Sequence, residues 1–468
     1  MWKFNKLGSA LLLFALAAIV AFAALDYSDA SKGSFSRFHL SPSSPFSWLT
    51  PPLSPLPSPI HTNPKESTED QYVVKRTEEG DGKLKRLEGE LATARALIRE
   101  AINSRPNDTK ALQDSYYVPQ GNIYRKASAF HRSYLLMEKL FKVYVYKEGE
   151  PPLFHYGPCK DIYSMEGVFI NSLEINKQFQ TQNPDEAHVY FLPFSVVMIL
   201  QHLFHPVIRD KAVLGRTIGD YVQIISHKYP YWNRSYGADH FMLSCHDWGP
   251  RSTWYVKELY FISIRVLCNA NISEHFNPKK DASFPEINLK TGETGGLLGG
   301  YPAWNRTILA FFAGKMHGRI RPSLFQHWKD KKDKNVLVYE TLPEGFSYEE
   351  AMKKSKYCIC PSGFEVASPR IVEAIYAECV PVIISQQYVL PFSDVLNWHS
   401  FSVQISVSEI PRLKEILMGI SHEQYLRMQE NVKKVQRHFV VNYPPKRYDV
   451  FHMIIHSIWL RRLNVHVK

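Results

Sequence analysis

Residues 357–384 constrain the fold of this chain more than any other part of the sequence. They read as a short apolar strand, a loop of Pro, Ser and Gly, a helix over about 368–378 and a β-branched strand over 380–384. Ser368 is expected to be the helix N-cap and Pro369 the first helical residue. This order of elements is typical of one half of a parallel α/β unit.

The loop before this helix carries the groups that a phosphate site needs. A helix N-terminus offers unpaired N–H groups and the positive end of a dipole. Arg370 can add a fork of donors for a diphosphate, and Glu373 one turn later can accept two ribose hydroxyls. Glu365 completes a Glu-x7-Glu spacing with Glu373. The alternative is an ordinary strand–loop–helix unit in which Arg370 and Glu373 form an exposed i,i+3 pair.

The amino-acid sequence of this stretch and of several earlier blocks closely resembles that of the exostosin-like glycosyltransferases of family 47, in particular the plant branch. The resemblance spans residues 135–440, and its blocks are Lys142–Tyr146, Glu186–Phe194, Tyr229–His240, Cys245–Gly249, Phe311–Lys315, Gly363–Ile384 and Leu390–Val395. It implies the GT-B fold, in which two Rossmann-like domains face a cleft. It also implies an inverting transfer of a sugar from a nucleotide-sugar donor, expected to be UDP-linked, to a cell-wall polysaccharide.

An apolar run near the N-terminus bears on the cellular location. Residues 7–25 carry no charged side chain, and a helix of this length spans about 28 Å, enough to cross a membrane. Two lysines precede the run and two aspartates follow it, which keeps residues 1–6 in the cytosol and sends the rest to the lumen. The alternative is a cleaved signal peptide ending near 21–23. With the family resemblance, the run predicts a single-pass type II protein of the Golgi membrane.

Residues 26–135 are expected to form a stem. Ser41–Pro59 holds seven prolines and six serines, a composition that cannot build a core. Residues 83–102 repeat apolar side chains at a spacing of three and four. This pattern indicates either a short coiled coil, which would pair the chain with itself or with another glycosyltransferase, or one amphipathic helix packed on the body.

The remaining sequence is expected to form two α/β domains. The first covers 136–290 and the second 305–422, and the linker 291–304 begins with five glycines in ten residues. The helices of 423–468 are expected to pack back on the body. Because ligands of parallel α/β folds bind at the carboxyl ends of the strands, the cleft between the domains is the expected site.

The donor chemistry is expected to need no metal and no other cofactor, because the sequence contains neither Asp-x-Asp nor a Cys-x2-Cys pair. A helix end and cations would then stabilise the leaving diphosphate. The predicted donor-binding residues are Lys315, Arg319, Arg321, Ser362, Gly363, Glu365, Ser368, Arg370 and Glu373.

An inverting transfer needs a general base for the acceptor hydroxyl, and the first domain should supply it. The densest group of titratable side chains in that domain is Asp239, His240, His246 and Asp247, where an Asp–His couple can accept a proton near neutral pH. Glu166 is a further candidate. Asp239 and His240 also suit the capping and packing of a turn.

Other features fit a lumenal protein. Glycosylation sequons occur at Asn107, Asn233, Asn271 and Asn305, all after the apolar run. The six cysteines are compatible with disulfides in an oxidising compartment, although the sequence does not choose their pairing. The net charge of +11 comes from scattered Lys and Arg without a nucleic-acid motif, so no nucleic-acid partner is expected, whereas a polyanionic acceptor such as pectin stays open.

Two hypotheses compete with an active transferase. One is a non-catalytic subunit of GT-B shape that scaffolds an active partner, and the other is a secreted lectin. The intact Gly363, Arg370 and Glu373 favour activity over the scaffold. The lectin hypothesis requires the apolar run to be cleaved. It does not explain the glycine loop before the helix, which suits a phosphate group.

Overall fold

The computed structural model describes residues 78–467, except 104–115, 206–209 and 330–332. The predicted membrane anchor at 7–25, the Pro- and Ser-rich part of the stem and Asn107 therefore lie outside the described residues. Within the described part, no helix is both long enough and apolar enough to cross a membrane.

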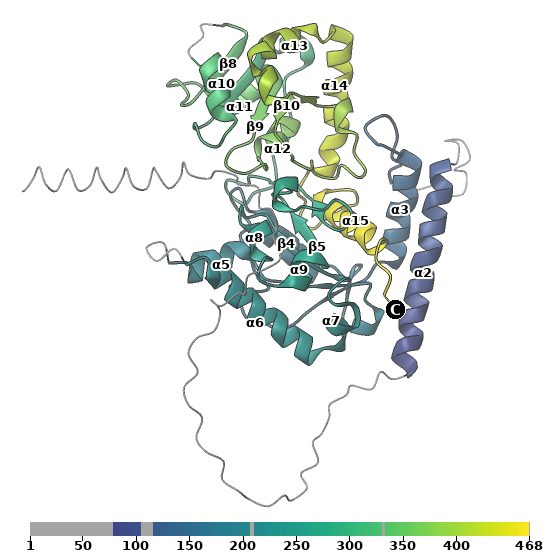
Figure 1. The fold of residues 1–468 in the computed structure, drawn as a ribbon. Helices are drawn as coiled ribbons and strands as arrows, with labels where there is room; N and C mark the ends of the chain where they lie inside the picture. Colours follow the sequence, from purple (N-terminus) through teal and green to yellow (C-terminus); the bar gives the residue numbers. More distant parts are fainter. Residues whose placement is uncertain (1–77, 104–115, 206–209, 330–332, 468) are drawn as a thin grey trace, which may run out of the picture. The chain divides into compact units, whose positions relative to one another are not determined.

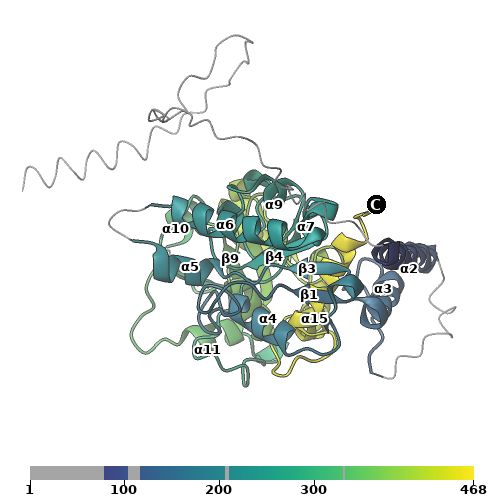
Figure 2. The ribbon, with the colours of Figure 1, turned by 90° about the horizontal axis from the view of Figure 1, so that it is seen from below.

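The first sheet is parallel throughout, with strand order β2-β1-β3-β4-β5-β6. Helices α4 (Met165–Glu174) and α15 (Val450–Arg462) cover one face, and α5 (Val196–Leu203) and α6 (Ala212–Lys228) cover the other (Figure 2). Because both faces are covered, the strands are apolar almost throughout. The strands are β1 (Val143–Val145), β2 (Gln180–Thr181), β3 (Val189–Phe191), β4 (His240–Ser244), β5 (Ile264–Leu267) and β6 (Ala282–Ser283).

The second sheet is also parallel, with strand order β11-β10-β9-β7-β8. Figure 1 shows it with its helices as a second unit beside the first sheet. The sequence-based expectation of an α/β protein with parallel sheets is confirmed. The elements are β7 (Ile308–Ala313), α10 (Arg321–Trp328), β8 (Val336–Tyr339), α11 (Tyr348–Lys354), β9 (Ser355–Pro361), α12 (Arg370–Tyr376), β10 (Val380–Ile384), β11 (Val403–Gln404), α13 (Leu413–Gly419) and α14 (His422–Val435).

The C-terminal helices contact both sheets. Helix α14 packs against α12 and β10, and α15 packs against β5 and β6. In α15, Arg461 donates from Nε to the Asp281 carbonyl at 2.7 Å and pairs through Nη1 with Asp394 at 2.5 Å. One buried arginine thus joins the first sheet to the segment that follows β10.

Helix α2 (Glu78–Asn103) contains the predicted 3,4 repeat and packs beside α3 (Ala127–Leu140) (Figure 1). Leu91 and Ala94 of the repeat are buried in the main core, and Arg95 donates from Nε to the Leu463 carbonyl at 2.6 Å. The structure therefore shows the amphipathic-helix alternative. The predicted end of the stem at residue 135 is wrong, because the apolar faces of α2 and α3 make both helices part of the folded body.

Disulfides brace the strand ends of both sheets. Cys245–Cys268 joins the ends of β4 and β5, and Cys358–Cys379 joins β9 to the segment entering β10. Cys159 and Cys360 are free.

The described sequons differ in exposure. The side chains of Asn233 and Asn305 are exposed. Asn271 is partly buried, and its Oδ1 accepts a hydrogen bond from the Ser273 backbone N–H at 3.0 Å.

Candidate active site

A cleft of about 480 Å³ lies where the carboxyl ends of the two sheets meet. Its walls come from the loops after β4 and β6 of the first sheet, the loops after β7 and β9 of the second, and the first turns of α11 and α12. A volume of this size falls within the range of about 300–1,000 Å³ that is typical of small-ligand sites. The cleft therefore lies at the strand ends, where the sequence analysis expected a ligand.

Two arginines form the basic end of the cleft. Arg321 and Arg370 lie over the Phe312 ring, with their guanidinium carbons 5.7 and 5.2 Å from its centroid. Arg370 donates from Nη2 to the Ala313 carbonyl at 3.1 Å, and Arg321 donates from Nη1 to the Lys315 carbonyl at 3.1 Å. Neither guanidinium forms an ion pair with a carboxylate of the described residues. Burial and the neighbouring charge of Arg370 lower the pKa of Arg321 to about 10, so this end of the cleft favours an anion.

The loop after β9 adds a free hydroxyl to this basic end. Ser368 is buried and lines the cleft, and its Oγ has no hydrogen-bond partner among the described residues. The prediction that Ser368 caps the helix is wrong, since Pro369 directly precedes α12 and no side chain caps it. Gly363 also lines the cleft, and any side chain at this position would collide with the His317 ring.

The other predicted donor-binding residues divide into two groups. Lys315 lines the cleft, and Glu373 accepts a hydrogen bond from the Tyr348 hydroxyl at 2.7 Å. Arg319 is exposed and Ser362 is buried, and neither lines the cleft. The Ser362 hydroxyl is instead hydrogen-bonded to the Val366 carbonyl at 3.2 Å and to Ser385 Oγ at 2.6 Å. These bonds stabilise the loop itself.

Carboxyl groups from both domains also line the cleft. Asp247 follows β4, Glu286 follows β6, and Glu365 lies in the loop after β9. Glu365 Oε2 accepts a hydrogen bond from Asn269 Nδ2 at 2.7 Å, which links the two domains. Burial and the negative charges of Glu274 and Asp247 raise the pKa of Glu365 to about 7.

Asp247 and Glu286 both have a raised pKa. Burial raises the pKa of Asp247, whereas a hydrogen bond from Tyr163 lowers it. Glu286 is only 6% exposed, and burial together with the charges of Asp247 and Glu373 raises its pKa well above the ordinary value. The upward pKa shift is larger for Glu286 than for Asp247, so Asp247 is the better candidate of the first domain to accept a proton.

His246 lies next to Asp247 in sequence but does not line the cleft. Its Nδ1 accepts a hydrogen bond from the Trp248 backbone N–H at 2.9 Å, and its ring packs on Tyr163. Burial lowers the pKa of His246 to about 4, so the ring is neutral at physiological pH.

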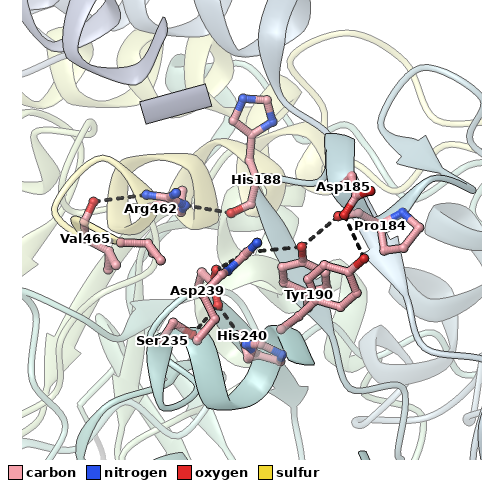
Figure 3. Close-up of polar contacts among 12 residues, drawn as sticks. Pro184, Asp185, His188, Tyr190, Ser235, Asp239, His240, Arg462 and Val465 are labelled. Carbon is pink, nitrogen blue, oxygen red and sulfur yellow. Dashed lines mark hydrogen bonds and ion pairs between the residues drawn. The ribbon is translucent and has the colours of Figure 1, made fainter. Parts of the chain in front are cut away.

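Asp239 and His240 are not at the cleft, so they are wrong as general-base candidates. β4 begins at His240, which places both residues at the amino edge of the sheet, opposite the cleft. Figure 3 shows Asp239 held between Ser235 and His240, with Oδ1 accepting from the serine hydroxyl at 2.6 Å and 2.8 Å from the His240 Nδ1. Arg234 pairs with Asp239 at 2.9 Å. The couple closes a buried network and cannot reach an acceptor.

Glu166 is also excluded as a base, because every lone pair that it could use is occupied. Its side chain is fully buried in the first turn of α4. The bonds to Oε1 come from the Ser244 hydroxyl at 2.6 Å and the backbone N–H groups of Cys245 and His246, and those to Oε2 come from the Ser195 hydroxyl at 2.6 Å and the Val197 N–H. Glu166 thus fixes the loops that follow β3 and β4.

We expect Glu166→Ala to lower the free energy of unfolding by at least about 3 kcal/mol, because it leaves several buried donors without an acceptor. Urea unfolding followed by circular dichroism measures this loss. Glu186→Ala is the matched control, since that side chain is exposed. A Glu166→Ala protein as stable as the control would show that these bonds do not hold the loops.

Several cleft residues were not predicted from the sequence. Glu286 and Asn288 follow β6, a strand too short to stand out, and Tyr348 begins α11 after an irregular loop. His317 follows β7, and Asn269, which follows β5, does not line the cleft but donates a hydrogen bond to Glu365. All of them come shortly after strands or open a helix, so a systematic search of polar residues after each apolar run could have found most of them.

Two parallel α/β domains that enclose such a cleft are the arrangement expected of a glycosyltransferase. The family model of the exostosin GT47 domain matches residues 137–420 of the chain. The chain therefore belongs to the exostosin GT47 family of glycosyltransferases.

Individual relatives agree with this membership. A protein of Arabidopsis thaliana named as a probable glycosyltransferase is 69% identical over 387 residues, which cover 82% of each chain. A probable glucuronosyltransferase of Oryza sativa subsp. japonica is 27% identical over 68% of this chain and 80% of its own. A probable beta-1,4-xylosyltransferase of Arabidopsis thaliana is 27% identical over 68% of this chain and 81% of its own.

Among solved structures, MurG of Acinetobacter baumannii is similar to 44% of this chain and 71% of its own. The TM-score is 0.23 and the sequence identity is 12%.

Proposed function

We propose that this protein transfers a sugar from a nucleotide-sugar donor, UDP-linked, to a cell-wall polysaccharide. The observation that carries the proposal is the pair Arg321 and Arg370, two guanidinium groups that share one aromatic ring and line the cleft without an ion pair among the described residues. Guanidinium groups bind phosphate oxygens through paired, charge-assisted hydrogen bonds. The free Ser368 hydroxyl and Lys315 complete a site for the leaving diphosphate.

The transfer proceeds in one displacement with inversion. The acceptor hydroxyl attacks the anomeric carbon of the donor, the bond from that carbon to the diphosphate oxygen breaks, and UDP leaves. Asp247 takes the hydroxyl proton, because it is the ionisable carboxylate that the first domain places in the cleft. The positive charge of Arg321 and Arg370 stabilises the negative charge that develops on the leaving group.

Glu373 is suited to bind the ribose of the donor. Tyr348 holds its Oε2, while Oε1 has a long contact of 3.4 Å from Asn288 Nδ2. A carboxylate oriented in this way can accept hydrogen bonds from ribose hydroxyls. Together these groups orient the donor across the cleft of a GT-B arrangement.

The donor site is proposed to work without a metal ion. Among the described residues, no group of three or more His, Cys, Asp or Glu side chains is arranged to hold one. The three cations Lys315, Arg321 and Arg370 supply the positive charge that the diphosphate needs.

We place the protein in the Golgi membrane as a single-pass type II protein with a lumenal catalytic body. The apolar run 7–25 and the sequons support this location. The two disulfides add to the argument, since such bonds form in oxidising compartments.

Binding of UDP tests the proposal directly. At 100 times its dissociation constant, UDP should stabilise the protein by about 2.7 kcal/mol, seen as a rise in Tm by differential scanning fluorimetry. GDP at the same concentration is the control for base specificity. If a well-folded sample responds to neither nucleotide nor to any nucleotide sugar, the scaffold hypothesis would replace this proposal.

A further inference from the structure

Three residues that line the cleft carry a buried polar atom with no hydrogen-bond partner among the described residues. The atoms are Nε of Arg321, the hydroxyl oxygen of Ser368 and Nδ1 of His317. A buried polar atom without a partner costs free energy, so such atoms are uncommon in folded proteins unless a ligand or water satisfies them. The proposed function uses the arginine and the serine as ligands of the diphosphate. It leaves His317 without a role.

The other ring nitrogen of His317 determines where the ring carries its proton. Nε2 lies 2.6 Å from Nη1 of Arg321. A guanidinium group only donates hydrogen bonds, so Nε2 must accept this one and carries no proton. The neutral ring then has its proton on Nδ1, which makes the unpaired Nδ1 a donor. Burial and the charges of Arg321 and Arg370 lower the pKa of His317, which favours this neutral form.

The loops after β7 and β9 hold the imidazole ring in place. His317 lies in the first of them, and Phe364 of the second stacks on it, with the ring centroids 5.0 Å apart and the planes 11° apart. The loops approach so closely that a Cβ on Gly318 would lie 1.9 Å from the Gly363 carbonyl oxygen. A Cβ on Gly363 would lie 3.0 Å from Nδ1 of His317. Nδ1 is therefore beside the loop that leads into α12 and carries the proposed phosphate contacts.

We propose that His317 is a further residue of the donor site, and that its Nδ1–H donates a hydrogen bond to an oxygen of the diphosphate. This role rests on the proposed function, since it needs a diphosphate bound by Arg321 and Arg370. When the bond from the anomeric carbon to the diphosphate oxygen breaks, the electron pair stays on the leaving group. A hydrogen bond from a fixed donor strengthens as this negative charge grows. His317 transfers no proton in the step, and UDP leaves as an anion.

The competing role for His317 is to position Arg321 only. In that case the contact between Nε2 and the guanidinium group matters, and Nδ1 does nothing. The buried and unpaired state of Nδ1 argues against this role, because positioning alone gives no reason to leave a donor unsatisfied in the cleft.

Two substitutions separate these roles, because each keeps the function of one ring nitrogen. The amide nitrogen of asparagine is bonded to Cγ, as Nδ1 of histidine is, so His317→Asn can keep the donor. The amide group of glutamine lies one bond further from the backbone, near the position of Nε2. His317→Gln can therefore keep the contact to Arg321, but it loses the Nδ1 donor. The two roles predict opposite rankings of the variants.

Isothermal titration calorimetry with UDP measures this ranking on the full chain. We expect His317→Gln to bind UDP at least about tenfold more weakly than the unmodified protein, since it lacks one hydrogen bond to a charged group. His317→Asn should stay within about threefold of the unmodified protein. His399→Gln is the matched control, because His399 is exposed on the same domain and does not line the cleft. Thermal unfolding shows whether each variant is folded.

The outcomes separate the role of His317 from the proposed function. If UDP binds to the unmodified protein and equally tightly to His317→Gln, Nδ1 is not a ligand, and the proposed function stands without it. If the loss in His317→Asn equals or exceeds that in His317→Gln, His317 acts by positioning Arg321, and the Nδ1 contact is overturned. If neither UDP nor any UDP-sugar binds to the unmodified protein, the proposed function is overturned together with this role.

Discussion

Asp247→Asn should lower kcat by about 10²–10⁴-fold while UDP binds as before. An amide of the same shape fills the loop after β4 but cannot accept the proton of the acceptor hydroxyl. Asp247 lines the cleft from the loop after β4 of the first sheet, whereas the arginines proposed to hold the diphosphate belong to the second domain. The loss should therefore appear in the turnover of the donor, which is measured as the release of UDP. The affinity for the nucleotide should not change.

The controls for this experiment come from the same domain. Asp220→Asn changes an exposed carboxylate on α6 and should leave kcat unchanged. Glu286→Gln should cost far less than Asp247→Asn, because burial raises the pKa of Glu286 well above its ordinary value and leaves less of it ionised to act as a base. If Asp247→Asn retains the full rate, the proton is taken by another group.

The pH profile gives the same assignment a second readout. Burial raises the pKa of Asp247 above its ordinary value, and the base must be ionised to work. The rate of the unmodified protein should therefore be low at acidic pH and rise with pH as the raised pKa of Asp247 is passed. The residual activity of Asp247→Asn should lack this acid limb. NMR of the product should show inversion of the anomeric centre.

The sequence predicted the second sheet well because its strands carry strong local signals. Apolar runs bounded by Pro, Ser and Gly located β9 and β10 around α12, and the run at Val336–Tyr339 matches β8. These signals depend on backbone preferences and burial within a few residues of each other. They also located Gly363 and Arg370, since a loop between a parallel strand and its helix always opens at the same edge of a sheet.

The site residues of the first domain were harder to predict, because nearness in sequence does not show at which edge of a sheet a residue lies. Asp239 and Asp247 are separated by little more than β4, yet this strand carries one to the buried amino edge and the other to the cleft. The sequence shows the cluster but not where the strand begins. Glu166 was misjudged for a related reason, since its hydrogen-bond donors come from residues 195–197 and 244–246.

The end of the stem was predicted incorrectly because the local sequence does not carry the necessary information. Helix α2 has the repeat of an amphipathic helix, which fits a coiled coil and a packed helix equally well. The choice is made by distant groups, among them Arg462, whose Nη2 lies 2.5 Å from Glu88 Oε1. A contact across most of the chain leaves no trace in a window of a few residues.

Arg321→Ala and Arg370→Ala should each weaken UDP binding by about 1–3 kcal/mol, because each removes charge-assisted hydrogen bonds to a diphosphate. In dissociation constants this is a loss of roughly 5–150-fold. The two side chains share the Phe312 ring and would share one ligand, so we expect the losses to be non-additive in the double variant. Calorimetry with UDP measures all three proteins.

Arg319 is the matched control. It lies in the loop after β7, shortly before Arg321, is exposed and does not line the cleft. Arg319→Ala should bind UDP like the unmodified protein. Removal of metal ions with EDTA should leave UDP affinity unchanged, because Lys315 and the two arginines carry the positive charge at this end. Unchanged affinity in both Arg321→Ala and Arg370→Ala, with thermal unfolding showing intact folds, would move the diphosphate away from the loops after β7 and β9. An equal loss in Arg319→Ala would instead attribute binding to the general positive charge of the protein, since only a specific site distinguishes the guanidinium groups that line the cleft from the exposed one outside it.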